Sequence, residues 1–206
     1  MSIRLLAFAA STRKASVNRR LITRLAHLAG DQGAEINLLD LNDFPMPLYD
    51  GDSEEANGRP ASADRLQALF ASHQGLLLAT PEYNGFFSPL LKNTFDWLSR
   101  PDTEGQSGMD ALRGMPVGIV SASPGGMGGM RALPFVRLYL NNLGMLVAPQ
   151  QIAVSRAGSA FREDGSLDDE GQDHALASVA QQVIELARLR HAHAVKSIPI
   201  RRPTSS

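Results

Sequence analysis

Short apolar runs, in which polar residues do not alternate with apolar ones, constrain the fold of this chain more than any other feature of its sequence. Four such runs end in small or polar residues, and a weaker fifth follows them; they span residues 3–11, 34–41, 75–84, 115–126 and 144–150. Strands that are apolar on both faces are typical of a parallel sheet covered by helices on both sides. The runs therefore predict the strands of a buried parallel sheet.

Stretches with helical spacing follow the strand-like runs. Apolar residues recur every three to four positions in residues 16–33, 62–75, 90–100, 130–144 and 173–194. Strand and helix thus alternate about five times, which favours an α/β doubly wound sheet of five parallel strands. Pro134 either starts its helix or bends it. Residues 47–62, rich in acidic, Gly and Pro residues, are expected to form an exposed loop.

Length, charge and cysteine content exclude several classes of protein. The 206 residues, 43% of them hydrophobic, are enough for one ordinary domain, which we place at residues 1–195 with a loose tail at 196–206. A net charge of −1 offers no global field for nucleic acid or an anionic membrane, so an anion must be bound locally. The absence of cysteine excludes disulfides and thiolate chemistry. With no membrane-length apolar segment, we expect a cytoplasmic protein.

The first candidate binding loop, residues 10–18, follows the first predicted strand. It carries hydroxyls at Ser11 and Ser16, the guanidinium of Arg13 and the amide of Asn18 at a helix start. Such groups can hold a phosphate, and without a Walker lysine or a GxGxxG pattern the loop suggests a mononucleotide. Equally, Ser16 could simply cap the helix while the cations are solvated.

A second polar loop, residues 81–85, follows the third strand. Pro81 cannot donate to a sheet ladder and should end the strand, which leaves Glu82, Tyr83 and Asn84 exposed where a ligand could lie. Taken alone, however, Asn84-Gly85 is better explained as a turn and Tyr83 as ordinary packing.

A third loop, residues 121–131, holds four glycines in five positions after the fourth strand. The backbone freedom of glycine is costly, which favours a close approach to a flat partner over a mobile linker at this position. All three loops fall at the carboxyl edge of the predicted sheet, where open α/β sheets bind ligands.

Together the motifs STRKASVN, PEYN with LKNTFDWL, and SASPGGMGGMR resemble the NADPH-dependent FMN reductase family, from about Ile3 to the helix after Arg131. The resemblance implies a flavodoxin-like fold, FMN as cofactor, and NADPH or NADH as the hydride donor. It also implies a small-molecule electron acceptor such as a quinone, and a homodimer or homotetramer. The residues that it places at FMN are Ser11, Arg13, Ser16, Val17, Asn18, Pro81, Glu82, Tyr83, Asn84, Gly85, Ser121, Ser123, Gly125 and Gly126.

Two departures from the family pattern are visible. Ala10 stands where a glycine is usual, and Phe86 and Phe87 follow PEYNG, where they are predicted to border the acceptor side of the cleft. Lys14 and Arg131 are candidates for holding the extra phosphate of NADPH. No catalytic acid or base is assigned, because the cofactor carries the chemistry, and the scattered histidines indicate no metal site.

Two other classes of function remain as alternatives. An electron carrier or a flavin-binding regulator would work through a protein partner, but such flavodoxins tend to be strongly acidic. A phosphate-binding hydrolase on the same fold would need an aspartate at the end of the first strand, where this sequence has none. Fold alone does not choose among these functions.

Overall fold

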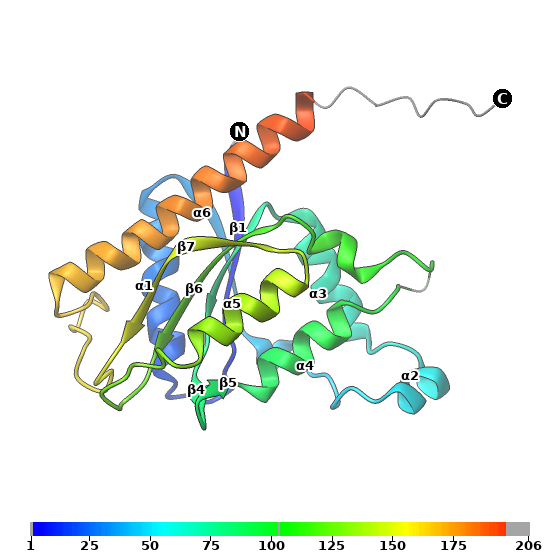
Figure 1. Ribbon diagram of the computed structural model, residues 1–206, viewed down its shortest axis with the longest axis horizontal. Coiled ribbons are helices and arrows are strands. Elements are labelled where there is room, and N and C mark those ends of the chain that lie inside the picture. Colours follow the sequence, from blue (N-terminus) through cyan, green and yellow to red (C-terminus); the bar gives the residue numbers. More distant parts are fainter. Residues whose placement is uncertain (1, 103, 197–206) are drawn as a thin grey trace.

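A five-stranded parallel sheet forms the centre of the molecule in a computed structural model, which describes residues 2–102 and 104–196 (Figure 1). The strand order is β2-β1-β3-β6-β7, which is the flavodoxin-like order. The strands are β1 (Ile3–Ala9), β2 (Ala34–Leu39), β3 (Gly75–Ala79), β6 (Pro116–Ala122) and β7 (Leu146–Val154). The predicted doubly wound five-stranded sheet is therefore confirmed.

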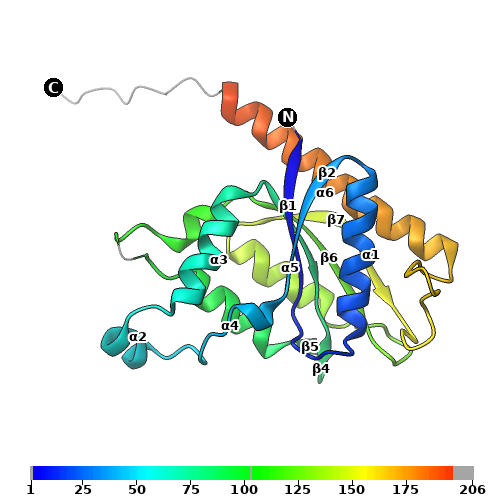
Figure 2. The ribbon, with the colours of Figure 1, turned by 180° about the vertical axis from the view of Figure 1, so that it is seen from behind.

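Helices cover both faces of the sheet, with α1 and α5 on opposite faces in the two opposed views (Figures 1 and 2). One hydrophobic cluster joins the sheet to α1 and α6, and a second joins its other face to α3, α4 and α5. The helices are α1 (Val17–Asp31), α2 (Gly51–Asn57), α3 (Ala61–Ser72), α4 (Pro89–Leu98), α5 (Leu133–Asn142) and α6 (Glu170–Lys196), with short 3-10 turns at Leu41–Asp43 and Gly108–Ala111.

The core follows from the apolar runs. All five residues of β3 and all seven of β6 are buried, as expected for strands with a helix layer on each face. The edge strand β7 contains Pro149, and its register against β6 shifts between Val117 and Ile119. A proline is tolerated at such an edge because no further strand needs its missing N–H.

Three local predictions are refined. Residues 47–62 are largely exposed, but they include the helix α2, because the Asp50 side chain accepts a hydrogen bond from the Ser53 N–H and caps it. Pro134 lies in the first turn of α5, so that helix starts there and does not bend. Of the predicted C-terminal tail at 196–206, Lys196 is the last residue of α6, and residues 197–206 lie outside the described residues.

Candidate functional site

The loops that follow β1, β3 and β6 are joined by hydrogen bonds at the carboxyl edge of the sheet. The Ala10 N–H donates to the Ala79 carbonyl at 2.8 Å, and the Thr80 N–H donates to the Val120 carbonyl at 3.0 Å. The buried Ser121 hydroxyl donates to the Thr80 carbonyl at 2.7 Å. The predicted convergence of the three loops is therefore observed, and it rests partly on Thr80, which the sequence did not single out.

Asn18 ties the first loop to the third. Its Nδ2 donates to the Ala122 carbonyl at 2.9 Å, while its Oδ1 accepts the Ala122 N–H at 2.9 Å. The side chain is 2% exposed, so this pair of bonds is shielded from water. The Asn18 side chain thus fixes the loop that would hold a phosphate, and its backbone N–H belongs to the start of α1.

The start of α1 offers donors that the protein itself does not use. Ser16 is buried and occupies the N-cap position, yet its side chain makes no capping hydrogen bond, so the capping explanation of this residue is wrong. The N–H groups of Val17 and Asn18, in the first turn, have no intrahelical acceptor. Ser11, also buried, lies two residues after the end of β1 in the same loop. This donor set fits an anion at the positive end of a helix.

The PEYN segment forms a small antiparallel hairpin. Strands β4 (Glu82–Tyr83) and β5 (Phe86–Phe87) pair across Asn84 and Gly85, whose φ angles of 53° and 83° define a type I′ turn. The turn explanation of Asn84-Gly85 is thus confirmed. Tyr83 is 50% exposed, so its ring is available at the rim of the site.

Glu82 fastens this hairpin to the end of the glycine-rich loop. Its side chain is only 6% exposed and pairs with the Arg131 guanidinium, with Nε to Oε1 at 2.7 Å. The Arg131 N–H also donates to Glu82 Oε2 at 3.1 Å. Arg131, which the sequence suggested for the extra phosphate of NADPH, is therefore already engaged.

Phe86 and Phe87 differ in their surroundings. Phe87 is 7% exposed and stacks on Tyr139, with the ring centroids 5.1 Å apart. Burial raises the pKa of Tyr139 above its ordinary value, so its phenol stays neutral. Phe86 is 46% exposed and lies 4.7 Å from the Phe135 ring. Of the two phenylalanines, only the half-exposed Phe86 can contact another molecule.

The glycines of the third loop have two distinct roles. A Cβ on Gly126 would meet no atom within 4 Å, and one on Gly125 would meet only the Ser123 hydroxyl at 3.7 Å. By contrast, a Cβ on Gly129 would overlap Ser121 Oγ, and one on Gly128 would lie 2.7 Å from the backbone of β7. Gly125 and Gly126 leave bare backbone facing open space, which suits a flat ligand, whereas Gly128 and Gly129 are needed for the fold.

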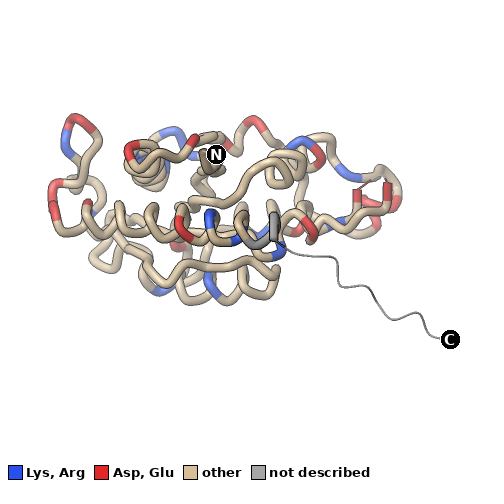
Figure 3. The backbone as a smooth tube through the Cα atoms, turned by 90° about the horizontal axis from the view of Figure 1, so that it is seen from above, with Lys and Arg blue, Asp and Glu red and all other residues tan. Residues whose placement is uncertain are grey.

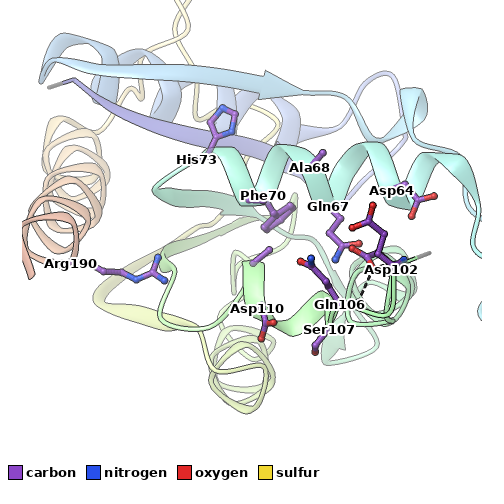
Figure 4. Close-up of a pocket in the computed structure, with 13 residues that line it drawn as sticks. Asp64, Gln67, Ala68, Phe70, His73, Asp102, Gln106, Ser107, Asp110 and Arg190 are labelled. Carbon is purple, nitrogen blue, oxygen red and sulfur yellow. Dashed lines mark hydrogen bonds between the residues drawn. The ribbon is translucent and has the colours of Figure 1, made fainter. Parts of the chain in front are cut away.

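A cavity of about 660 Å³, whose lining residues Figure 4 shows, contains none of the residues of these loops. Its lining includes His73 just before β3 and Asp110 ahead of β6, so it opens at the amino edge of the sheet. Within residues 2–102 and 104–196, no group of three or more His, Cys, Asp or Glu side chains is placed to hold a metal ion. No helix in that part of the chain is long and apolar enough to cross a membrane.

Comparisons with known proteins agree with this geometry. Residues 3–159 match the NADPH-dependent FMN reductase family. A quinone reductase from Pseudomonas putida is 34% identical over 160 residues, covering 77% of this chain and 81% of the relative. An NAD(P)H-dependent FMN reductase from Pseudomonas aeruginosa is 33% identical over 183 residues, covering 88% and 91%. The solved flavoenzyme NAD(P)H:(acceptor) oxidoreductase FerB from Paracoccus denitrificans superposes with a TM-score of 0.76 at 26% identity, covering 91% of this chain and 98% of that one.

The fold and the three joined loops define a flavodoxin-like oxidoreductase of the flavoprotein class. More particularly, the chain belongs to the NADPH-dependent FMN reductase family, whose cofactor is FMN and whose electron donor is NAD(P)H. The unused donors at Ser16 and the bare backbone at Gly125 and Gly126 fit such a cofactor.

Proposed function

We propose that this enzyme uses NAD(P)H to reduce quinones or similar small acceptors at the carboxyl edge of its sheet. The observation that carries the proposal is the presence at this edge of two features that a bound ligand can use. The first is the buried N-cap residue Ser16 at the start of α1, whose side chain makes no capping hydrogen bond. The second is the backbone of Gly125 and Gly126, which no side chain covers. Relatives named quinone reductase support the acceptor class.

The residues of the site divide into three roles. The first group holds the FMN phosphate with hydroxyl, guanidinium and helix N–H donors. The second lines the ribityl chain and ring, and the third flanks the opposite side of the ring with small side chains and open backbone. The groups are Ser11, Arg13, Ser16, Val17 and Asn18; then Pro81, Glu82, Tyr83, Asn84 and Gly85; then Ser121, Ser123, Gly125 and Gly126.

Bound FMN supplies the redox chemistry, accepting a hydride from NAD(P)H and passing electrons to the acceptor. The protein's own contribution is to hold the binding loops, and thus the bound molecules, in fixed positions. The Asn18 hydrogen bonds and the Glu82–Arg131 ion pair hold the three loops at fixed separations. The electron donor and the acceptor therefore bind to the same preformed surface of the site. The half-exposed rings of Tyr83 and Phe86 offer apolar contact to an incoming ring.

An electron carrier that docks on a protein partner is the alternative function. Such carriers present a strongly charged face, whereas acidic and basic residues are interspersed along this chain in the view from above (Figure 3). The net charge of −1 agrees with that picture. The distribution of charge thus favours a small-molecule acceptor.

A homodimer in the cytoplasm is part of the same proposal. The exposed side chains of Phe86, Phe135 and Leu138, on the β5 hairpin and on α5, line one shallow apolar pocket. Such a cluster of large apolar groups on one face is typical of a subunit contact. The described chain has no membrane-spanning helix that would argue for another location.

The test is an absorption spectrum of the purified protein, followed by an assay of steady-state NADPH oxidation. Purified protein loaded with FMN should show flavin absorption bands that bleach when NADPH is added without oxygen. Steady-state NADPH oxidation should then depend on an added quinone, as expected for an enzyme and not for a carrier that lacks its reductase. A protein that takes up no FMN, or that takes it up but oxidises neither NADPH nor NADH, would refute the proposal.

A further inference from the structure

A second cavity, which we call the basic cavity, runs along α1 from the loop proposed to hold the FMN phosphate. Its volume is about 630 Å³. At the start of the helix it is lined by Arg13, Ser16 and Val17, which belong to that loop. Further along it is lined by Thr23 and His27, about two to three helical turns away. The cavity is therefore continuous with the phosphate site and extends well beyond it.

FMN fills only the near end of this cavity. The molecule ends at its phosphate, which already has the buried hydroxyls of Ser11 and Ser16 and the first N–H groups of α1. No part of FMN then remains to occupy the space beside Thr23 and His27. Because cavities of a few hundred Å³ hold small organic ligands, that space suits a group that continues from the same phosphate.

Two arginines of the cavity are already neutralised. Arg19 donates to Asp40 at 2.6 Å, and Arg24 makes a two-pronged pair with Asp173 at 2.9 and 2.5 Å. Hydrogen bonds from Arg24 raise its own pKa and lower that of Asp173. These two arginines hold the helix in place and leave little charge for a ligand.

Lys14 and Arg20 keep their charge for an anion. Neither forms an ion pair with a carboxylate in residues 2–102 and 104–196. The Arg20 guanidinium lies 4.4 Å from the centroid of the Phe161 ring, which orients the side chain without neutralising it. Arg20 follows Val17 by about one turn of α1, so a phosphate bound there is next in line after the one at the helix start.

The loop between β7 and α6 forms another wall of the cavity and contributes Gly158, Asp164 and Gly165. Asp164 Oδ1 accepts from the Ser166 hydroxyl at 2.6 Å and from the Ser166 N–H at 2.9 Å, and these bonds lower the pKa of Asp164. An ionised carboxylate repels a phosphate but accepts well from ribose hydroxyls. The two glycines leave room for a flat base, so this wall suits a nucleoside.

We propose that the basic cavity takes the adenylate half of FAD, so that the protein binds FAD as well as FMN. The inference rests on the proposed function, because it takes the first loop as the site of the FMN phosphate. In FAD that phosphate carries a second phosphate, a ribose and an adenine. Lys14 and Arg20 bind the second phosphate, and Asp164 accepts from the ribose hydroxyls. These cations replace the backbone N–H groups of a GxGxxG turn, which this sequence lacks.

The first experiment adds FAD to the FMN-loaded protein in up to about a hundredfold excess over FMN. Free FMN is then measured by its fluorescence, and the flavin that stays with the protein is identified after gel filtration. FAD should displace FMN and leave one flavin bound per chain, because the two cofactors share one phosphate site. This readout is independent of turnover.

The second experiment measures the affinity of flavin-free protein for FMN and for FAD in two variants. Arg20→Gln removes a charge-assisted contact, and Thr23→Trp fills the far part of the cavity from an exposed position. Each should weaken FAD binding by about tenfold or more and change FMN binding by less than about twofold. Arg188→Gln, an exposed arginine on α6, is the matched control and should change neither.

Three results would overturn the inference while leaving the proposed function intact. One is FAD that fails to displace FMN at the full excess. Another is an equal loss of affinity for both flavins in the variants, which would place Arg20 and Thr23 at the FMN phosphate. The third is an unchanged affinity for FAD in either variant. Uptake of neither flavin by the natural protein would instead refute the proposed function itself.

Discussion

At the scale of single residues, two glycines of the same loop, Gly126 and Gly129, differ in why a side chain is absent there. Gly126 has open space where a side chain would project, while Gly129 has a φ of 92° and a Cβ there would overlap Ser121 Oγ. The same residue type is therefore proposed to serve the ligand at position 126, while it is needed by the backbone at position 129.

Substituting these glycines separates the two roles. Gly126→Val should fold normally but bind FMN at least about tenfold more weakly, because the side chain occupies the face left open for the ring. Gly129→Ala should lower the free energy of unfolding by about 1 to 3 kcal/mol. Thermal unfolding and FMN titration of both variants check this. Full FMN affinity in a folded Gly126→Val protein would remove that glycine from the site.

At the scale of elements, one partly buried ion pair joins α1 to α6 beside the apolar cluster that the two helices share. Asp173 on α6 accepts two hydrogen bonds from Arg24 on α1, and these lower the pKa of Asp173. A carboxyl whose pKa is lower in the folded state stabilises the fold at pH values above its unfolded pKa. That stabilisation disappears as the pH falls through the folded value.

Asp173→Asn should therefore cost about 1.5 to 3 kcal/mol of unfolding free energy near neutral pH. The difference from the natural protein should shrink once the pH falls below the ordinary aspartate pKa of about 3.9. Denaturant unfolding at several pH values measures it. As a control, Asp168→Asn removes the exposed ion pair with Arg162 and should cost under about 1 kcal/mol. A difference that stays constant down to low pH would contradict the assignment.

At the scale of the whole molecule, the apolar face around α5 should be covered by a second copy. Light scattering after gel filtration is expected to give a homodimer or a larger even assembly. Phe135→Glu with Leu138→Glu should give a folded monomer, because burying two carboxylates in an apolar contact is costly. Leu189→Glu, at a similarly exposed leucine on α6, is the matched control and should leave the assembly unchanged. A monomeric natural protein would contradict this expectation.

Much of the architecture could be predicted from the sequence because it depends on local pattern. Unbroken apolar runs such as Leu76 to Ala79 indicate buried parallel strands, and Pro81 ends one of them. The clustering of the three loops followed from the same pattern, since parallel strands bring their carboxyl ends to one edge. The hairpin β4–β5 and the helix α2 were missed, because each is too short for periodicity to reveal.

What the residues do within the site was decided by tertiary contacts. Ser16 looked like a cap and has a free hydroxyl, while Arg131 looked free and is bound to Glu82. Phe86 and Phe87 are adjacent in sequence, yet only one is half exposed, because successive strand residues face opposite sides. Sequence alone determined the fold class and the location of the binding edge through local periodicity. Only the tertiary structure decided which polar groups remain available, because their partners lie far away along the chain.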